Sequence, residues 1–123
     1  MEKKEELKKM LDELNKISGV HASAIVSRDG LIISASLPED VDQETVAAMS
    51  ATLAGTAEQV CAELKSGLFE RTIIEGTEGN IISIGAGPLA ILISLTSPDA
   101  KLGLVLIEMK RVADKVKKIL EEK

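Results

Sequence analysis

A long central helix without charged residues is the feature that most constrains the fold of this chain. Residues 45–57, TVAAMSATLAGTA, contain no charged side chain, although charged residues make up 28% of the sequence. A surface helix normally carries a charged stripe opposite its apolar one, so a helix that lacks this stripe is covered on more than one side. The sequence therefore predicts that the helix packs on the protein's own sheet with one face and on a second protein chain with another.

The 3.6-residue period divides this helix into two faces. The large side chains recur at steps of three and four and are predicted to form the core face: Val46, Met49, Ser50, Leu53, Ala57, Val60, Cys61 and Leu64. Small or uncharged residues lie on the opposite side, where a second helix could approach closely: Ala48, Ala51, Thr52, Gly55, Gln59 and Ala62. A glycine in a helix interior costs roughly 1 kcal/mol relative to alanine, so Gly55 indicates a packing requirement. We expect the small face to form a homodimer interface. The alternative is a helix buried inside one large domain, which the length of 123 residues disfavours.

Length and composition limit the number of domains, the cellular compartment and the classes of partner. The chain is expected to form a single domain over residues 1–123. Its one cysteine, Cys61, cannot form an internal disulfide, which fits a reducing compartment. The charged start MEKKEELKKM does not resemble a signal peptide, and no apolar run reaches the roughly 20 residues of a membrane span, so a cytoplasmic protein is expected. A net charge of −5 and a single aromatic residue, Phe69, argue against nucleic-acid binding.

The turn signals predict the order α-β-β-α-β-β-β-α. An Asp-Gly pair between two β-prone runs is a strong hairpin signal, and Arg28-Asp29-Gly30 supplies it. The order corresponds to an α+β fold, a three-layer α/β/α sandwich in which helices cover both faces of a five-stranded antiparallel sheet. The expected elements are a first helix at about 3–17, strands at 20–27 and 31–36, a central helix capped by Asp40 or Asp42 and ended by Gly67, strands at 68–76, 80–86 and 89–96, and a last helix that begins at Ser97-Pro98-Asp99.

Two of these strands have distinct positions in the predicted sheet. Residues 89–93, LAILI, are apolar on both alternating faces, so this strand is expected to be central and covered on each side. Glu70, Arg71 and Glu75 interrupt the strand at 68–76, as charges do on edge strands that resist random pairing. We expect this edge to pair instead with a chosen partner, with Arg71 in a pair across it.

Three segments together resemble the Roadblock/LC7 family, small domains found among dynein light chains and regulators of Ras-like GTPases. They are residues 19–31, GVHASAIVSRDGL, the small-residue central helix, and residues 97–104, SPDAKLGL. The resemblance covers essentially the whole chain and is closest to a prokaryotic, free-standing member. It implies the sheet order 2-1-5-4-3, with the first and last helices on one face and the central helix on the other. It also implies a homodimer joined through the central helices and third strands, which adds Phe69, Arg71 and Ile73 to the expected interface.

The resemblance implies a non-catalytic homodimeric regulator or scaffold of a small Ras-like GTPase. One alternative is a structural adaptor, similar to the light chains, which docks into a larger complex without an effect on GTP turnover. Another is a small-ligand sensor with a pocket between sheet and helices. The predicted core of Ile, Leu and Val lacks the convergent polar groups that such a pocket needs.

An enzyme is not expected. Nucleophilic catalysis needs a nucleophile, a base and an orienting group, and the only histidine, His21, lies at the start of a strand. A zinc site needs three or four ligands, so no catalytic residues, metal or cofactor are predicted. Gly85-Ala86-Gly87 lacks the later glycine and lysine of a phosphate loop, so the chain should not bind GTP itself.

Arginine is the residue through which a regulator can act directly on a GTPase, by stabilising charge on the transferred phosphate. Arg28, in the hairpin turn, is the candidate contact with the best expected geometry. The favoured mechanism differs, because a dimer face can position the catalytic residues of the GTPase without supplying a catalytic group.

Overall fold

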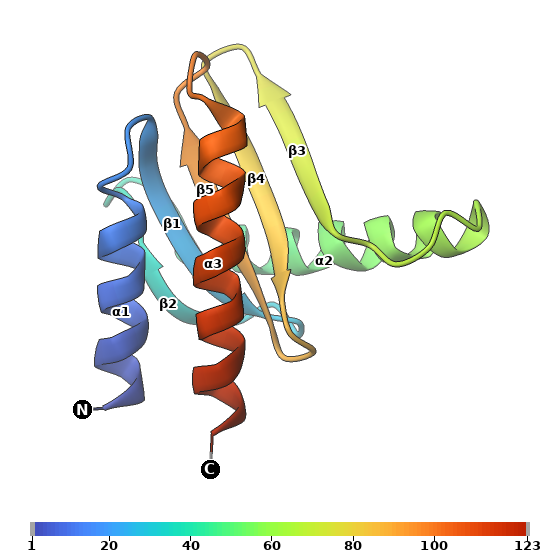
Figure 1. Cartoon of the computed structure of the whole chain (residues 1–123), viewed down its shortest axis with the longest axis horizontal. Coiled ribbons are helices and arrows are strands. Elements are labelled where there is room, and N and C mark those ends of the chain that lie inside the picture. The colour runs from blue at the N-terminus through green and yellow to red at the C-terminus, as the bar shows by residue number, and fades with distance from the viewer. Residues whose placement is uncertain (1, 123) are drawn as a thin grey trace.

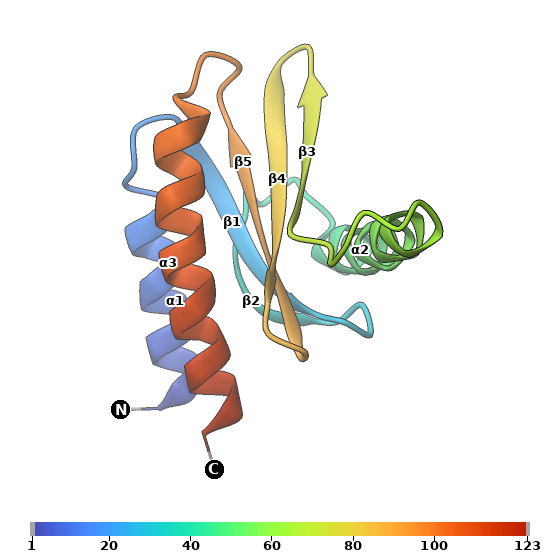
Figure 2. The ribbon, with the colours of Figure 1, turned by 45° about the vertical axis from the view of Figure 1, so that its right-hand side comes forward.

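The computed structural model describes residues 2–122 and has the predicted order of elements. Helices α1 and α3 lie side by side on one face of a five-stranded sheet, and α2 lies on the other face (Figures 1 and 2). The fold is therefore the predicted three-layer α+β sandwich. Its elements are α1 (Lys3–Leu14), β1 (Val20–Ser27), β2 (Ile32–Ser36), α2 (Gln43–Glu63), β3 (Arg71–Gly76), β4 (Gly79–Ala86), β5 (Ala90–Thr96) and α3 (Leu102–Glu121).

The strand order is β2-β1-β5-β4-β3, and all neighbouring strands are antiparallel. This is the order that the family resemblance implies. Strand β5 is central, and every one of its residues except Leu95 is buried, as its two-sided apolar sequence predicts. Strand β3 lies at an edge, and every one of its residues except Thr72 is exposed. The contrast between β5 and β3 follows from local residue patterns alone.

The ends of α2 are capped by two different devices. Asp42 is the N-cap, and it accepts hydrogen bonds from the Thr45 hydroxyl at 2.9 Å and the Thr45 backbone N–H at 3.2 Å. These bonds, the hydroxyl first, lower the pKa of Asp42 from its ordinary value. At the other end, the left-handed position after the C-cap belongs to Lys65 (φ 54°), and Ser66 N–H donates to Cys61 O. The helix was expected to end at residues 65–67 with Gly67 as the left-handed cap. Gly67 does have a left-handed φ of 96°, but Lys65 already takes the cap position two residues earlier.

Three other boundaries differ from the predictions. Helix α1 ends at Leu14, and residues 15–19 form a turn. Strand β3 begins at Arg71, because Phe69 packs against the hydrophobic cluster under α2 and draws the chain away from the sheet edge. Helix α3 begins at Leu102, since a turn in which Ala100 N–H donates to Ser97 O precedes it.

The core has two parts of unequal size. Most large buried side chains lie between the sheet and α1 and α3, including Leu11, Ile25 and Met109. The smaller cluster under α2 consists of Ala24, Val26, Ala47, Ala54, Ile91 and Ile93.

The predicted core face of α2 was wrong in part. Val46 packs against the cluster under α2, and Ser50, Leu53, Ala57 and Cys61 are half-buried, as expected. The buried residues of the helix are Ala47 and Ala54, whereas Met49 is 68% exposed and Leu64 is 74% exposed. The sheet supplies branched side chains on this face, so only small helix residues let the two layers approach closely. The larger Met49, Val60 and Leu64 are exposed instead.

Candidate protein interaction site

Helix α2 extends well beyond the sheet that it covers. It packs over β1, β2 and β5, and its C-terminal half projects past the edge strand β3 (Figure 1). Figure 2 shows the same helix nearly end on, standing out from the sheet on the β3 side. The projecting part carries exposed apolar side chains, with Val60 at 49% and Leu64 at 74%. Half of this helix therefore presents apolar surface that its own sheet does not cover.

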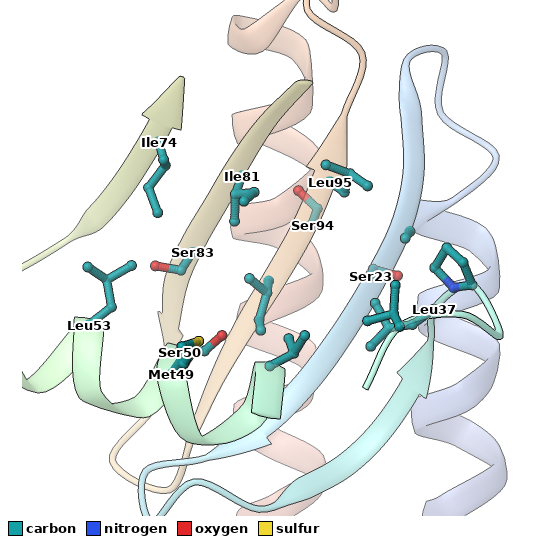
Figure 3. Close-up of a pocket in the computed structure, with 15 residues that line it drawn as sticks. Ser23, Leu37, Met49, Ser50, Leu53, Ile74, Ile81, Ser83, Ser94 and Leu95 are labelled. Carbon is teal, nitrogen blue, oxygen red and sulfur yellow. The ribbon is translucent and has the colours of Figure 1, made fainter. Parts of the chain in front are cut away.

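A groove of about 330 Å³ lies on the same face, between the N-terminal half of α2 and the sheet. Ile74, Ile81 and Leu95 form part of its floor, and each is 37–40% exposed. Met49 and Leu53 of α2 line one side (Figure 3). The other side is formed by the segment before α2, through Leu37, Pro38 and Val41. The groove is thus an apolar trough beside α2 that runs toward the β3 edge.

Two hydroxyl groups at this floor have no hydrogen-bond partner within the described chain. Ser83 is 1% exposed and lines the groove, and Thr72 lies directly opposite it on β3. The oxygens of both side chains are buried and unpaired among residues 2–122. They mark the polar spot of an otherwise apolar surface.

Among residues 2–122, β3 pairs with β4 on its inner side and with no strand on its outer edge, which is therefore open. Its residues alternate between the faces of the sheet. Thr72 and Ile74 lie on the α2 face, opposite the groove residues Ser83 and Ile81. Arg71, Ile73 and Glu75 lie on the α1/α3 face and are exposed.

The structure places the expected interface residues in three environments. Ala48, Thr52, Gly55, Gln59 and Ala62 are exposed on α2, and a Cβ added at Gly55 would meet nothing within 4 Å.

Ala51 and Phe69 contact their own chain instead. Ala51 lies beside the β1–β2 hairpin, with its Cβ 3.8 Å from the position that a Cβ on Gly30 would take. Phe69 is half-buried in the cluster under α2. Arg71 and Ile73 lie at the free edge, so the structure groups these two but not the whole predicted set.

The residues that sequence reasoning missed are the large apolar residues of α2. Met49, Leu53, Val60 and Leu64 recur at steps of four and seven, and the first two line the groove. The signal was present in the sequence, but the stripe was assigned to the protein's own core.

Arg28 is held in place by its own chain. Its guanidinium donates to Glu58 Oε1 on α2 at 2.9 Å and to the Gly87 carbonyl at 3.1 Å. Its side chain is 28% exposed, so the candidate contact predicted in the hairpin turn is partly covered by its own chain. Arg28 also lines a second cavity, of about 400 Å³, together with Glu70, Arg71 and Lys110.

Within residues 2–122, no cluster of three or more His, Cys, Asp or Glu side chains is arranged to hold a metal ion. In the same part of the chain, no helix combines the length and apolar character needed to cross a membrane.

Comparison with known proteins identifies the family. The Roadblock/LC7 domain matches residues 6–96. The protein MJ0310 of Methanocaldococcus jannaschii is 45% identical over 109 residues, which cover 89% of this chain and 95% of that protein.

Two solved structures are similar over nearly the whole chain. The gliding protein MglB of Thermus thermophilus superposes with a TM-score of 0.90 at 21% identity, covering 100% of this chain and 94% of that one. A structure of MglB with a tetrameric arrangement also gives 0.90, at 22% identity, covering 98% and 92%. At such identities these two likenesses show the fold alone.

Proposed function

The chain belongs to the Roadblock/LC7 family, and from this premise we propose that it is a non-catalytic homodimer that regulates or scaffolds a small Ras-like GTPase. The observation that carries the dimer is the combination of a projecting apolar helix half with an apolar groove on the same face. The GTPase as partner follows from the family resemblance.

Symmetry explains why the projecting helix and the groove belong together. A two-fold axis at the β3 edge, perpendicular to the sheet, would keep both copies of α2 on one face of a continuous sheet. The projecting half of α2 would then lie over the sheet of the second chain, and the helix of the second chain would return over this groove. Val60 and Leu64 would meet Ile74 and Ile81 of the other copy.

The structure changes which face of α2 we propose for this contact. Met49 and Leu53 line the groove, and Val60 and Leu64 continue the same stripe. Ala48, Gly55, Gln59 and Ala62 lie about half a turn away, on the side that faces away from the groove. The large stripe, together with Arg71 and Ile73 at the β3 edge, therefore replaces the small face as the main proposed interface.

Two charge substitutions on α2 test which of its faces forms the dimer interface. Met49→Glu would place a charge inside the paired helices without a partner, so we expect it to yield monomers that remain folded. Gly55→Glu, a matched change on the other side, should leave the dimer intact. Light-scattering mass after size exclusion measures both outcomes, and circular dichroism checks the fold. A monomeric Gly55→Glu beside a dimeric Met49→Glu would restore the small face as the interface, and a monomeric wild type would exclude the homodimer.

The regulatory role is tested by binding and turnover. We expect the dimer to co-elute with a Ras-like GTPase loaded with a non-hydrolysable GTP analogue and not with its GDP form, and to raise the GTP turnover of that GTPase. If the dimer binds without changing turnover, the adaptor function is favoured. Binding to neither form would remove this GTPase as the partner.

The turnover assay also tests whether Arg28 acts directly on the transferred phosphate. Its ion pair with Glu58 is partly exposed, and such pairs are worth about 0–1 kcal/mol, so the arginine could be released on binding. A directly acting arginine contributes about 10³-fold or more to GTP turnover. Because we propose that the dimer positions the GTPase's own residues, Arg28→Ala should lower turnover far less than this. A loss near 10³-fold with unchanged binding would identify Arg28 as the catalytic contact.

A further inference from the structure

The free edge of β3 carries charges that are complementary to those of its own copy. Arg71 lies at one end of the strand and Glu75 near the other, with Ile73 between them on the same face. Ile73 is 39% exposed, although it lies opposite the buried Ile82 of β4. Neither Arg71 nor Glu75 takes part in an ion pair among residues 2–122. Both charges are thus available to a second strand.

Symmetry restricts the register in which β3 can pair with its copy. A two-fold axis perpendicular to the sheet keeps each residue on its own face. Residues directly opposite each other in an antiparallel pair also share a face. Because neighbouring residues point to opposite faces, each residue can oppose only a residue an even number of positions away. One residue of β3 must therefore lie on the axis, opposite its own copy.

Four residues inside the strand could occupy the axis. Glu75 at the axis would bring two like charges together. Ile74 at the axis would set Ile73 against Glu75, and Thr72 at the axis would set Arg71 against Ile73. With Ile73 at the axis, each Arg71 opposes a Glu75 and the two Ile73 side chains oppose each other.

We propose that β3 pairs with the β3 of a second copy in the register centred on Ile73, held by two Arg71–Glu75 ion pairs between the chains. This proposal rests on the homodimer proposed above and specifies its sheet interface. Opposite charges directly across an antiparallel pair are stabilising, and like charges there are destabilising. The arrangement selects a partner with both charges in place and repels a chain that has either charge reversed.

The ion pairs around Arg71 in its own chain leave it available to an acid from outside. Arg28, Glu70 and Lys110 share the cavity beside it. Arg28 pairs with Glu58 and Lys110 with Asp114, whereas Arg71 forms no ion pair within residues 2–122. A carboxylate from the second strand would therefore meet an arginine that no acid of its own chain neutralises.

Charge reversal tests the register. Arg71→Glu and Glu75→Arg would each turn two attractive pairs into two repulsive ones, so we expect each to raise the dimer dissociation constant about ten- to hundredfold in sedimentation equilibrium. An equimolar mixture of the two variants should form a heterodimer of nearly wild-type affinity, because both pairs are then restored. Lys115→Glu and Glu121→Arg make the same charge changes at exposed positions of α3 and should leave the dissociation constant unchanged.

The outcomes distinguish this proposal from the homodimer itself. If both reversed variants dimerise as tightly as the wild type and the mixture shows no preference for the heterodimer, the register is overturned while the homodimer stands. If the wild type is monomeric at every concentration, both are overturned.

Cross-linking reads the register directly. Self-opposed residues in an antiparallel pair have Cα atoms about 4.5–5.5 Å apart, within reach of a disulfide. In a Cys61→Ser background, Ile73→Cys should oxidise to a covalent dimer on a non-reducing gel. Copies of residue 74 would be about 8 Å apart in this register, so Ile74→Cys should not cross-link. Cross-linking through Ile74→Cys and not through Ile73→Cys would contradict the register.

Discussion

At the scale of single residues, buried hydroxyl groups differ between the two faces of the sheet in whether they have hydrogen-bond partners. On the α1/α3 face, the Ser23 hydroxyl donates to Asn15 Oδ1 at 2.7 Å, and Asn15 Nδ2 donates to Ser36 Oγ at 2.8 Å. This chain of bonds joins the end of α1 to β1 and β2. On the α2 face, the hydroxyl of Ser83 is as deeply buried but has no partner within residues 2–122.

The same substitution should therefore have opposite effects at the two serines. Ser23→Ala leaves the Asn15 amide oxygen without its donor and should lower the free energy of unfolding by about 1 kcal/mol. Ser83→Ala removes an unsatisfied polar group and should raise that free energy by up to about 1 kcal/mol. Urea unfolding in a Met49→Glu background measures both without a contribution from dimerisation. Equal destabilisation by both variants would show that Ser83 has a partner in solution.

At the scale of elements, the fully buried contacts of α2 with the sheet are made by alanines, and Val46 is half-buried beside them. Ala47 is 0% exposed and Ala54 is 1% exposed, and both pack against the cluster that includes Ile91 and Ile93. The hairpin approaches just as closely, since a Cβ on Gly30 would lie 3.3 Å from the Ala48 Cα. Ala47, Ala51 and Ala54 thus serve contacts inside the protomer.

Enlarging one of these alanines should destabilise the protein although it adds apolar surface. Ala54→Leu would overpack the layer between helix and sheet and should cost about 1–3 kcal/mol in the free energy of unfolding. Ala62→Leu is the matched control, because Ala62 is exposed on the same helix and its replacement should change stability by less than about 0.5 kcal/mol. Urea unfolding of the two variants measures both changes in the free energy of unfolding. Similar losses at both positions would contradict the packing inferred for Ala54.

At the scale of the whole molecule, exposed apolar side chains of the single chain gather on the face of the sheet that α2 covers. The exposed stripe of α2 and the groove floor lie on the same face and continue toward the free β3 edge. Completion of this surface by a second copy would couple folding to association, since burial between chains then contributes to stability.

Thermal stability should therefore depend on protein concentration. For two chains that unfold together, a hundredfold rise in concentration should raise the melting temperature by about 5 °C. Calorimetry or circular dichroism over that range gives the measurement. The Met49→Glu chain serves as the control, and its melting temperature should not change with concentration. A wild-type melting temperature that is equally constant would show that the protomer folds without association.

The sequence by itself determined the order of the elements, the Arg28-Asp29-Gly30 hairpin and the central position of β5. These features depend on local patterns, namely turn residues and the alternation of apolar side chains along a strand, which act before distant parts of the chain meet. The sheet order required the family resemblance, because residue patterns alone do not say which strands become neighbours.

Only the tertiary structure decided which side of α2 faces the sheet, how Arg28 is held, and where the groove lies. The 3.6-residue period locates an apolar stripe on a helix, but it does not say whether the stripe meets the protein's own sheet or a different surface. The volume left above β1 and β5 decides this, and that volume depends on residues far apart in the sequence, such as Val26 and Ile91. Since the sheet fills the space with its own branched side chains, the alanines of α2 turn inward, and Met49 and Leu64 remain exposed.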